Sequence, residues 1–461
     1  MNVNEAASPL VLGIAGFGTV GAGLIRILTG NKAEITARCG RDIQVKHVLV
    51  RDAKRGRATP LPAGASLTTS MDDLVTDPEV DVIVELMGGI DAPRALITRA
   101  LEAGKHVVTA NKALLAETGN ELFALAEAKG LHLAYEASVC GGIPVVQTLR
   151  DGLTANKIQS LVGILNGTSN YILSEMTTKG MAFSEALKKA QELGYAEADP
   201  TLDIEGFDAA HKLAILIRLA WGADYPFDKI RVSGISSVEA ADILYARQFG
   251  YRIKLIGHAR MLNGSLSSGG IEASVSPTLV HETFLLARVG GAYNAVRIEG
   301  DAVGSVFLHG KGAGDMPTGS AVAADILTIA RNAAPNNTGF ARPSLPGSVR
   351  VVPLEESYSP YYMRLQVTDK PGVLRDIASI MADNGISIAQ VIQKEEGLPL
   401  APGQVAESGP AHTDSRAPTV PFIMMTHEAQ AEGINRAMQT LAASPMIHRS
   451  PVLYRVLPPR R

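Results

Sequence analysis

The chain has 461 residues, of which 46% are hydrophobic and 19% are charged. This length indicates two or three domains, and the apolar fraction is enough for several ordinary cores. The formal net charge of −3 gives no electrostatic reason to expect nucleic acid or an anionic membrane as a partner. Two cysteines, Cys39 and Cys140, cannot form a disulfide framework and favour a reducing cytoplasm. The first residues carry no signal-peptide pattern, and no apolar run is long enough to cross a bilayer.

Residues 9–135 alternate between strand-like and helix-like segments. The runs PLVLGIAG, QVKHVLV, VDVIVEL and KHVVTA are short and rich in β-branched residues, which is typical of buried parallel strands. Helical stretches such as VGAGLIRIL, PRALITRALEAG and NELFALAEAKG lie between some of them. This order predicts βαβ units around a parallel sheet, with a loop over residues 60–70.

The sequence GFGTVG, from Gly16 to Gly21, matches the G-x-G-x-x-G fingerprint. It follows a predicted strand and opens a predicted helix, which is the context that the fingerprint requires. Gly16 permits a tight turn, Gly18 lets the backbone approach a pyrophosphate, and Gly21 allows close packing of helix on strand. The helix N-terminus would then face the phosphates. The pattern therefore predicts dinucleotide binding rather than a bare turn.

The end of the second predicted strand bears on which dinucleotide binds. There VLVRDAKRGR gathers Arg51, Lys54, Arg55 and Arg57, with Asp52 as the only carboxylate. An acidic residue at this place favours the ribose hydroxyl of NAD, whereas a nearby arginine accommodates the 2′-phosphate of NADP. We therefore expect NADP(H) to be preferred, with NAD(H) as a second cofactor. The alternative is a solvated basic loop without a role in recognition.

Polar residues also follow a later strand of the predicted sheet. Ligands of open parallel sheets gather at the carboxyl ends of the strands, where Thr109, Asn111 and Lys112 are expected. A lysine there could hydrogen-bond a substrate carboxylate or carbonyl. A surface lysine at a helix start is disfavoured, because a cation opposes the helix dipole there.

Two further turns are candidates for a binding site. Residues 136–146, EASVCGGIPVV, contain a turn of small residues whose exposed carbonyl oxygens would suit a hard cation. Residues 165–173, LNGTSNYIL, place Asn166, Thr168 and Ser169 before a predicted helix. Either Thr168 or Ser169 caps that helix, or the segment forms a polar wall of the substrate site, and the local pattern does not separate the two.

Residues 193–212, LGYAEADPTLDIEGFDAAHK, collect five carboxylates and end on a lysine. Asp208 and Lys212 are four apart, so they share one face of a helix, as an ordinary ion pair would. The apolar continuation LAILIRLAWG indicates a buried helix, and buried charges must be paired or used. A lysine beside carboxylates can act as a general acid or base, and spare carboxylates can hold an ammonium group. The segment therefore predicts a pocket for a small zwitterion with a reducible carbonyl.

The remaining chain predicts two more units. Residues 140–310 indicate a second α+β domain, and residues 310–333 a glycine turn followed by a helix. The Pro- and Gly-rich residues 335–348 predict a linker. After it, YYMRLQVTDKPGVLRDIASIMADNGISIAQVIQK predicts strand, turn, helix and strand, and PFIMMTHEAQAEGINRAMQTLAA predicts strand and helix, with a loop over 395–419 between them.

Six motifs follow one another along the chain, namely GFGTVG, ELMGG, TANKALLA, YEASVCGGIP, GILNGTSNYIL and LGYAEADPTLDIEGFDAAHK. Together and in this order they resemble the motifs of homoserine dehydrogenases. The tail resembles an ACT domain, the ligand-sensing module of many enzymes of amino-acid biosynthesis, although the 395–419 insertion departs from compact ACT domains. The resemblance implies an α/β fold with a Rossmann-type parallel sheet, a second α+β substrate-binding and dimerisation domain, and a C-terminal ferredoxin-like ACT domain. These units would span residues 1–140 completed by 311–340, 141–310, and 355–461.

The resemblance implies interconversion of L-homoserine and L-aspartate 4-semialdehyde with NAD(P)(H), a branch-point step toward threonine and methionine. A lysine would supply a proton to the alkoxide that develops as hydride reaches the aldehyde carbon. Threonine, expected from pathway logic, would bind the ACT domain and inhibit the enzyme. The enzyme would be a homodimer or homotetramer in the cytoplasm, with no nucleic-acid or membrane partner and no fused aspartokinase.

The resemblance also implies roles for particular residues. Lys212 is the expected proton donor, with Lys112 as a second candidate at the same site. Glu197 and Asp208 would contact the amino-acid substrate, supported by Asp203. Cofactor contacts would fall on Gly16, Phe17, Gly18, Thr19, Val20, Gly21, Arg51, Thr109, Lys112, Gly194 and Gly312. A sodium ion would be held by groups of Glu136, Val139, Gly141 and Ile143.

Two other functions fit parts of the sequence. An aspartate-semialdehyde dehydrogenase handles the same aldehyde but needs a cysteine nucleophile, and Cys140 lies in a glycine turn of a homoserine dehydrogenase motif. Activity that depends on phosphate would distinguish that enzyme from a homoserine dehydrogenase. A redox sensor would bind NADPH and an amino acid without turnover, but the intact Glu197, Asp208 and Lys212 argue against a dead enzyme.

Overall fold

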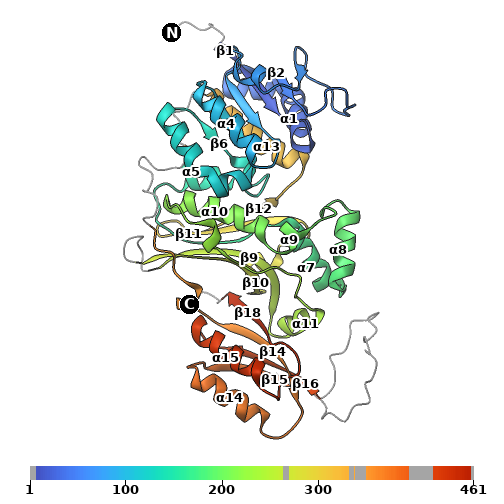
Figure 1. Cartoon of the computed structure of the whole chain (residues 1–461), viewed down its shortest axis with the longest axis vertical. Helices are drawn as coiled ribbons and strands as arrows, with labels where there is room; N and C mark the ends of the chain where they lie inside the picture. Colours follow the sequence, from blue (N-terminus) through green and yellow to red (C-terminus); the bar gives the residue numbers. More distant parts are fainter. Residues whose placement is uncertain (1–6, 263–268, 332–336, 338–348, 394–418, 458–461) are drawn as a thin grey trace.

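The computed structural model places a parallel sheet at one end of an elongated molecule, a mixed sheet in its middle and two C-terminal helices at the other end (Figure 1). The structure describes residues 7–262, 269–331, 337, 349–393 and 419–457. Among these residues, no helix has both the length and the hydropathy needed to cross a membrane.

The first sheet is wholly parallel, with strand order β3-β2-β1-β4-β5-β6. Its strands are β1 (Ala7–Ala15), β2 (Arg41–Leu49), β3 (Ser66–Thr68), β4 (Val82–Glu85), β5 (His106–Thr109) and β6 (Leu133–Ala134). Its helices are α1 (Thr19–Gly30), α2 (Lys32–Cys39), α3 (Asp72–Val75), α4 (Asp91–Glu102) and α5 (Lys112–Lys129). This doubly wound order confirms the predicted Rossmann-type sheet. The predicted loop over 60–70 is wrong at β3, because three residues are too few to show a strand period.

Helix α13 (Asp315–Ala330) returns late in the chain to pack against α1, as Figure 1 shows. Two glycines permit this close approach. A Cβ on Gly23 would collide with the backbone of Asp315, and a Cβ on Gly319 would lie 2.8 Å from the amide nitrogen of Leu24. Within the predicted glycine turn and helix over residues 310–333, the turn at 312–314 and the helix from Asp315 to Ala330 are confirmed, whereas residues 310 and 311 end strand β12 and residues 332 and 333 lie outside the described residues.

Two predicted loops fall largely outside the described residues. The loop over 395–419 does so except for its last residue, which begins a strand, and of the predicted linker over 335–348 only Asn337 is described. Asn337 is buried against β6, where its side chain accepts from the amide of Leu133 and donates to the carbonyl of Leu131.

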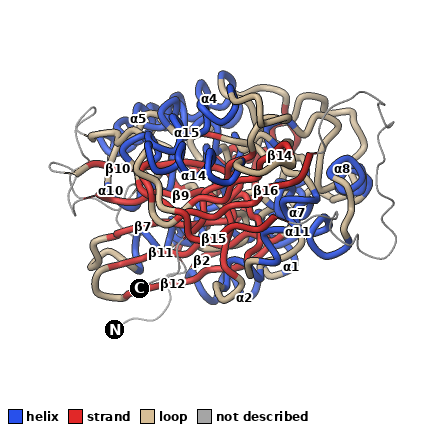
Figure 2. Tube along the Cα trace, turned by 90° about the horizontal axis from the view of Figure 1, so that it is seen from below, coloured by secondary structure: helices blue, strands red, loops and turns tan. Residues whose placement is uncertain are grey.

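The second sheet has ten strands in the order β12-β11-β7-β9-β10-β18-β14-β16-β15, with β8 pairing with β10. The strands that the middle domain contributes to it are β7 (Ile158–Ile164), β8 (Arg231–Val232), β9 (Tyr251–Leu262), β10 (Gly270–His281), β11 (Tyr293–Gly300) and β12 (Gly304–Lys311). The helices of this part are α6 (Val145–Gln147), α7 (Gly167–Lys179), α8 (Phe183–Glu192), α9 (Thr201–Ile204), α10 (Phe207–Trp221), α11 (Ala240–Gln248) and α12 (Leu285–Arg288). Viewed from below, the strands run side by side across the molecule (Figure 2).

The C-terminal part repeats a strand–helix–strand unit. Its strands are β14 (Tyr361–Thr368), β15 (Ile388–Gln393), β16 (Thr419–Thr426) and β18 (Val452–Leu457), and its helices are α14 (Val373–Asp383) and α15 (Ala431–Ala443). A short pair, β13 (Tyr358–Ser359) and β17 (Ala429–Gln430), lies beside them. The order β18-β14-β16-β15 confirms the predicted ferredoxin-like ACT domain. Leu365, Ile377, Phe422 and Ile434 meet in its core.

The C-terminal domain shares its sheet with the middle domain. Strand β18 pairs antiparallel with β14 and parallel with β10, where Thr278 faces Arg455. Arg364 of β14 donates to the fully buried Asp242 of α11, with an Nε–Oδ1 distance of 2.7 Å. The two domains are therefore joined by backbone pairing and by a buried ion pair.

Candidate active site

The glycine-rich turn lies between β1 and α1, at the carboxyl end of the parallel sheet. Gly16 has a φ of 112°, and a Cβ there would lie 2.5 Å from the carbonyl oxygen of Leu86, so only glycine fits. Gly18 faces open space, and a Cβ on Gly21 would collide with the carbonyl of Gly16. The turn opens onto a cavity of about 670 Å³ that also reaches Thr19. This volume is within the range of cofactor sites.

The basic segment after β2 forms another wall of this cavity. Arg51, Asp52 and Arg57 all line it. The guanidinium of Arg57 lies 5.7 Å from the centre of the Phe17 ring and donates to the carbonyl oxygen of Asp52. Arg57 is therefore held in place, whereas Arg51 has no hydrogen-bonding partner within the described chain and is exposed.

A second group of polar side chains surrounds Asp208, in the first turn of α10. The Nζ of Lys212, one turn further along, lies 2.7 Å from Oδ2 of Asp208. The Nζ of Lys112, at the start of α5 in the first domain, lies 3.1 Å from Oδ1. Two lysines from two domains thus converge on one buried carboxylate. The i,i+4 spacing predicts the pair of Asp208 with Lys212, whereas only the resemblance implied that Lys112 lies at the same site.

The charges of this group reinforce one another. Burial alone would raise the pKa of Asp208, but Lys212 and Lys112 hold it well below its usual value. Burial alone would lower the pKa of Lys212, but Asp208 raises it above its usual value. Burial and the neighbouring Asp208 raise the pKa of Asp203. At neutral pH the core of the site is therefore a charged lysine–aspartate pair.

Asn166 joins both carboxylates. Its Oδ1 accepts from the amide of Ser169 and caps α7, while its Nδ2 donates to Asp203 Oδ1 and Asp208 Oδ2 at 2.7 Å each. The hydroxyl of Ser169 donates to the carbonyl oxygen of Asp203. The predicted capping by Thr168 or Ser169 is wrong, because both residues lie inside α7 and Asn166 is its N-cap. The Asn166 amide offers an acceptor for the cap and donors for the two carboxylates, and the lining of a substrate site by this segment stays a prediction.

Asn294 on β11 is a residue that the sequence did not single out. Its Nδ2 donates to the carbonyl oxygen of Leu165, which also accepts from the Nζ of Lys212 at 2.7 Å. Asn294 is fully buried, and its Oδ1 has no hydrogen-bond partner in the described structure. Gly312 packs directly against it, where a Cβ would collide with the Asn294 side chain. A lone asparagine in a strand carries no local signal of this role.

Thr109 and Asn111 link the two groups of residues. Thr109 is buried and donates to Oε2 of Glu85, and its hydroxyl accepts from the amide of Asn111. Asn111 in turn donates to the carbonyl oxygen of Gly89. Gly89 belongs to the loop after β4, which borders the cavity at the glycine-rich turn. The residue before Lys112 is thereby tied to the loop beside the cavity.

Two predicted site residues lie apart from this network. Glu197 is exposed between α8 and α9, and its carboxylate makes no recorded contact with Asp208 or the lysines within the described residues. Gly194 is exposed in the turn after α8, has a φ of 74°, and does not line the cavity at the glycine-rich turn. Their predicted roles stay predictions.

The turn from Glu136 to Ile143 is buried except at Gly142, which is exposed. The Glu136 carboxylate accepts from two backbone amides at the start of α6, at 2.9 and 2.7 Å. Consecutive left-handed residues follow, with φ of 57° at Cys140 and 52° at Gly141. The carbonyl oxygens of Val139 and Gly141 accept no hydrogen bond within the described chain. The described residues contain no cluster of three or more His, Cys, Asp or Glu that is suited to a metal. The potential ligands for a cation at this turn are therefore carbonyl oxygens.

Cys140 is unsuited to nucleophilic catalysis. The residue is fully buried, and burial raises the pKa of its thiol to about 11. Since the thiolate is the reactive form, this environment disfavours the acyl transfer of an aspartate-semialdehyde dehydrogenase.

The fold and the site define a dinucleotide-dependent oxidoreductase that carries a C-terminal domain of ferredoxin-like topology. The model of the homoserine dehydrogenase NAD-binding domain matches residues 16–136, the homoserine dehydrogenase model residues 144–327 and the ACT model residues 361–443.

Known proteins support the same family. A homoserine dehydrogenase of Pseudomonas aeruginosa is 44% identical over 443 residues, which cover 94% of this chain and 96% of that protein. The crystal structure of a homoserine dehydrogenase from Thiobacillus denitrificans has a TM-score of 0.87 at 43% identity and covers 97% of this chain and 98% of its own. A hyperthermophilic archaeal homoserine dehydrogenase in complex with NADPH has a TM-score of 0.59 at 25% identity, over 71% of this chain and all of its own. The chain belongs to the homoserine dehydrogenase family.

Proposed function

We propose that the protein interconverts L-homoserine and L-aspartate 4-semialdehyde, uses NADP(H) in preference to NAD(H), and is inhibited by threonine. The observation that carries the reaction is the carboxylate of Asp208 held between Lys212 and Lys112. This charged group is tied through Asn111 to the loop beside a cavity with a dinucleotide-binding turn.

Lys212 is the proposed general acid and base. Its ammonium group has three protons, of which two are donated to Asp208 and to the carbonyl of Leu165. The third is free to protonate the alkoxide as the aldehyde is reduced, or Lys212, once neutral, can accept the hydroxyl proton in the reverse reaction. The nicotinamide supplies or accepts the hydride when the cofactor is bound. Lys112 is the second candidate, since its side chain is 41% exposed and more accessible.

The carboxylates are proposed to hold the substrate. Asp208, with Asp203 and Glu197, would attract the ammonium group that homoserine and the semialdehyde share. Asn166 keeps Asp203 and Asp208 in fixed positions, so the substrate would meet a preorganised site. Gly194 and Gly312 are proposed to lie near the cofactor.

Arg51 is proposed to favour NADP(H), because it lines the cofactor cavity with its guanidinium unpaired among the described residues. The NADPH complex of the archaeal homoserine dehydrogenase supports this choice. The other proposed contacts are Gly16, Phe17, Gly18, Thr19, Val20, Gly21, Thr109 and Lys112.

The turn from Glu136 to Ile143 is proposed to hold a sodium ion. The unpaired carbonyls of Val139 and Gly141 fit such an ion, with the carbonyls of Glu136 and Ile143 as further ligands. The ion would brace the turn, whose residue Gly141 packs against Gly312.

We propose that the units are residues 1–140 completed by 311–340, 141–310 and 355–461, and that the chain assembles as a homodimer or homotetramer in the cytoplasm. The test of function is the absorbance of the reduced nicotinamide, followed with aspartate semialdehyde and NADPH or NADH, with and without threonine. Oxidation that threonine suppresses supports the reaction and its regulation together, the NADPH/NADH ratio tests the cofactor preference, and oxidation indifferent to threonine removes the regulatory part. Cofactor binding without oxidation would favour the redox sensor instead.

A further inference from the structure

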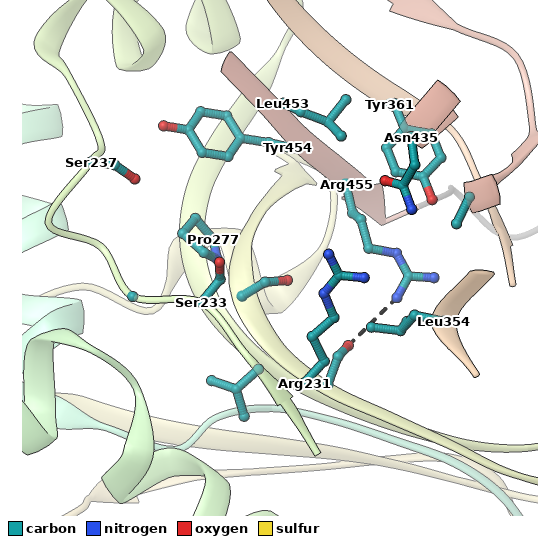
Figure 3. Close-up of a pocket in the computed structure, with 15 residues that line it drawn as sticks. Arg231, Ser233, Ser237, Pro277, Leu354, Tyr361, Asn435, Leu453, Tyr454 and Arg455 are labelled. Carbon is teal, nitrogen blue, oxygen red and sulfur yellow. Dashed lines mark hydrogen bonds between the residues drawn. The ribbon is translucent and has the colours of Figure 1, made fainter. Parts of the chain in front are cut away.

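A second cavity, of about 190 Å³, lies where the C-terminal domain meets the middle domain (Figure 3). Drug-sized pockets measure about 300–1,000 Å³, so this one suits a small metabolite. It borders a gap beside β10. Strand β8 pairs with β10 at Ser274 and Val275, and β18 pairs with it from Thr278 onward. Pro277 lies between the two pairings and has no N–H to continue a ladder.

Two arginines enter the cavity from different domains. Figure 3 shows the side chains of Arg231, on β8, and Arg455, on β18, directed into the same space. Arg231 Nη1 lies 3.4 Å from Oε1 of Glu355 at the surface. Arg455 Nη2 lies 2.9 Å from Oε1 of the fully buried Glu272, which Arg260 also contacts. Since carboxylates balance part of this positive charge, the cavity favours a zwitterion over a multiply charged anion.

The remaining lining matches the other parts of a small amino acid. It includes the side chains of Ser233, Ser237, Ser276, Asn435, Leu354 and Leu453. Hydroxyl and amide groups can hydrogen-bond an ammonium or a side-chain hydroxyl, and the leucines can contact a methyl group. The arginine pair can hold a carboxylate through charge-assisted hydrogen bonds.

The cavity wall also contacts the segment that leads to Asp208, at the residue next to Asp203. Gly234 lines the cavity, and a Cβ on it would lie 2.5 Å from the carbonyl oxygen of Ile204. The amide of Ile235 donates to that same carbonyl at 2.7 Å. Ile204 follows Asp203 and lies four residues before Asp208. A ligand that displaces the wall at Gly234 would therefore move the segment that carries the substrate carboxylates.

We propose that this interdomain cavity is the effector site, and that Arg231 and Arg455 together bind the carboxylate of a small amino acid. The proposal rests on the proposed inhibition by threonine, and it places that ligand between the two domains rather than within the ACT domain alone. Because each domain supplies one arginine, a bound ligand would fix the position of the two domains relative to each other. A change in this position would in turn move the segment before Asp208.

The test uses the full-length enzyme and L-threonine as the probe. Inhibition of homoserine oxidation, relative to each variant's own uninhibited rate, and calorimetric binding are compared for wild type, Arg231→Gln and Arg455→Gln. Arg436→Gln is the matched control, because Arg436 lies on α15 next to Asn435 but pairs with Glu432 outside the cavity. L-Threoninamide, which lacks the carboxylate, is the control ligand.

We expect both cavity variants to weaken threonine binding and inhibition roughly tenfold or more, with the control variant unchanged and threoninamide a poor inhibitor of wild type. If Arg455→Gln does not fold because Glu272 loses a partner, the surface-paired Arg231→Gln decides alone. Wild-type inhibition in Arg231→Gln, or equal inhibition by threoninamide, would overturn the site and leave threonine regulation standing. If wild type does not bind threonine, the site and the regulatory part of the proposed function both fail, while the rate without threonine tests the reaction separately.

Discussion

The Nζ of Lys212 lies 2.7 Å from Oδ2 of Asp208, and both side chains are at most 10% exposed. Lys179 and Glu175 on α7 make an ion pair of the same spacing and the same 2.7 Å length, but the lysine side chain there is 52% exposed. The Glu175 side chain is buried, but Lys179 lies at the surface, where water screens its charge and weakens its contribution to stability. The first pair is enclosed, so Lys212 stays protonated and in a fixed position until a reacting oxygen accepts the proton.

Replacing Lys212 with alanine is expected to lower kcat by about 10²–10⁴-fold, the usual contribution of a general acid. Lys112→Ala is expected to raise KM more than it lowers kcat. Initial rates with homoserine and NADP⁺ measure both effects, and circular dichroism checks the fold. Lys179→Ala, which breaks the surface pair, should keep the wild-type rate. Activity of Lys212→Ala within a few-fold of wild type, with a large loss in Lys112→Ala, would exchange the two roles.

Arg51→Ala is expected to raise KM for NADPH about tenfold and to change KM for NADH about twofold or less, because only NADPH carries the 2′-phosphate. Steady-state rates with each cofactor measure the ratio. Arg94→Ala removes another exposed arginine, one that pairs with Glu121 on α5, and should change neither value. An equal rise for both cofactors would show that Arg51 does not distinguish them.

The Rossmann-type sheet and the lysine–aspartate pair were predictable because local patterns encode them. The fingerprint at Gly16 lies between a β-branched strand and a helix, and the spacing of Asp208 and Lys212 places them on one helical face. The role of Asn294 was not predictable, because it depends on a carbonyl 129 residues earlier in the chain. The pairing of β18 with β10 was missed for the same reason, since the sequence of a strand does not specify the strand with which it pairs.

Lys254 on β9 gives a prediction for stability against pH. It is buried, donates to Asn170 Oδ1 and to the carbonyl of Val289, and burial together with the nearby Arg252 lowers its pKa from 10.5 to about 8. Between these pH values the unfolded chain holds a proton that the folded chain has released, so stability rises with pH. As the pH rises across this window, the free energy of unfolding of wild type is expected to increase by about 3 kcal/mol relative to that of Lys254→Met.

Urea unfolding of wild type and Lys254→Met at several pH values from 7 to about 10.5 measures this gain, because groups common to both proteins cancel in the difference. Below about pH 8 the difference between the two proteins should be constant. A difference that stays constant over the whole range would mean that Lys254 does not release its proton early on folding.

Removal of residues 355–461 is expected to destabilise what remains, because the C-terminal domain shares a sheet with the middle domain. The fragment would leave the edge of β10 without β18 and the buried Asp242 without Arg364. An exposed edge strand favours aggregation, and breaking one buried ion pair costs about 3–5 kcal/mol. The soluble yield and thermal unfolding of the fragment, compared with the full chain, measure the effect.

Arg364→Met in the full chain separates the two causes, since it removes the partner of Asp242 and keeps β18 in place. We expect this variant to be soluble with a lowered Tm, and the fragment to aggregate. A soluble fragment with the Tm of the full chain would show that the middle domain does not need β18. In that case deletion would be a clean test of regulation, whereas the shared sheet indicates that point substitutions in the interdomain cavity are required.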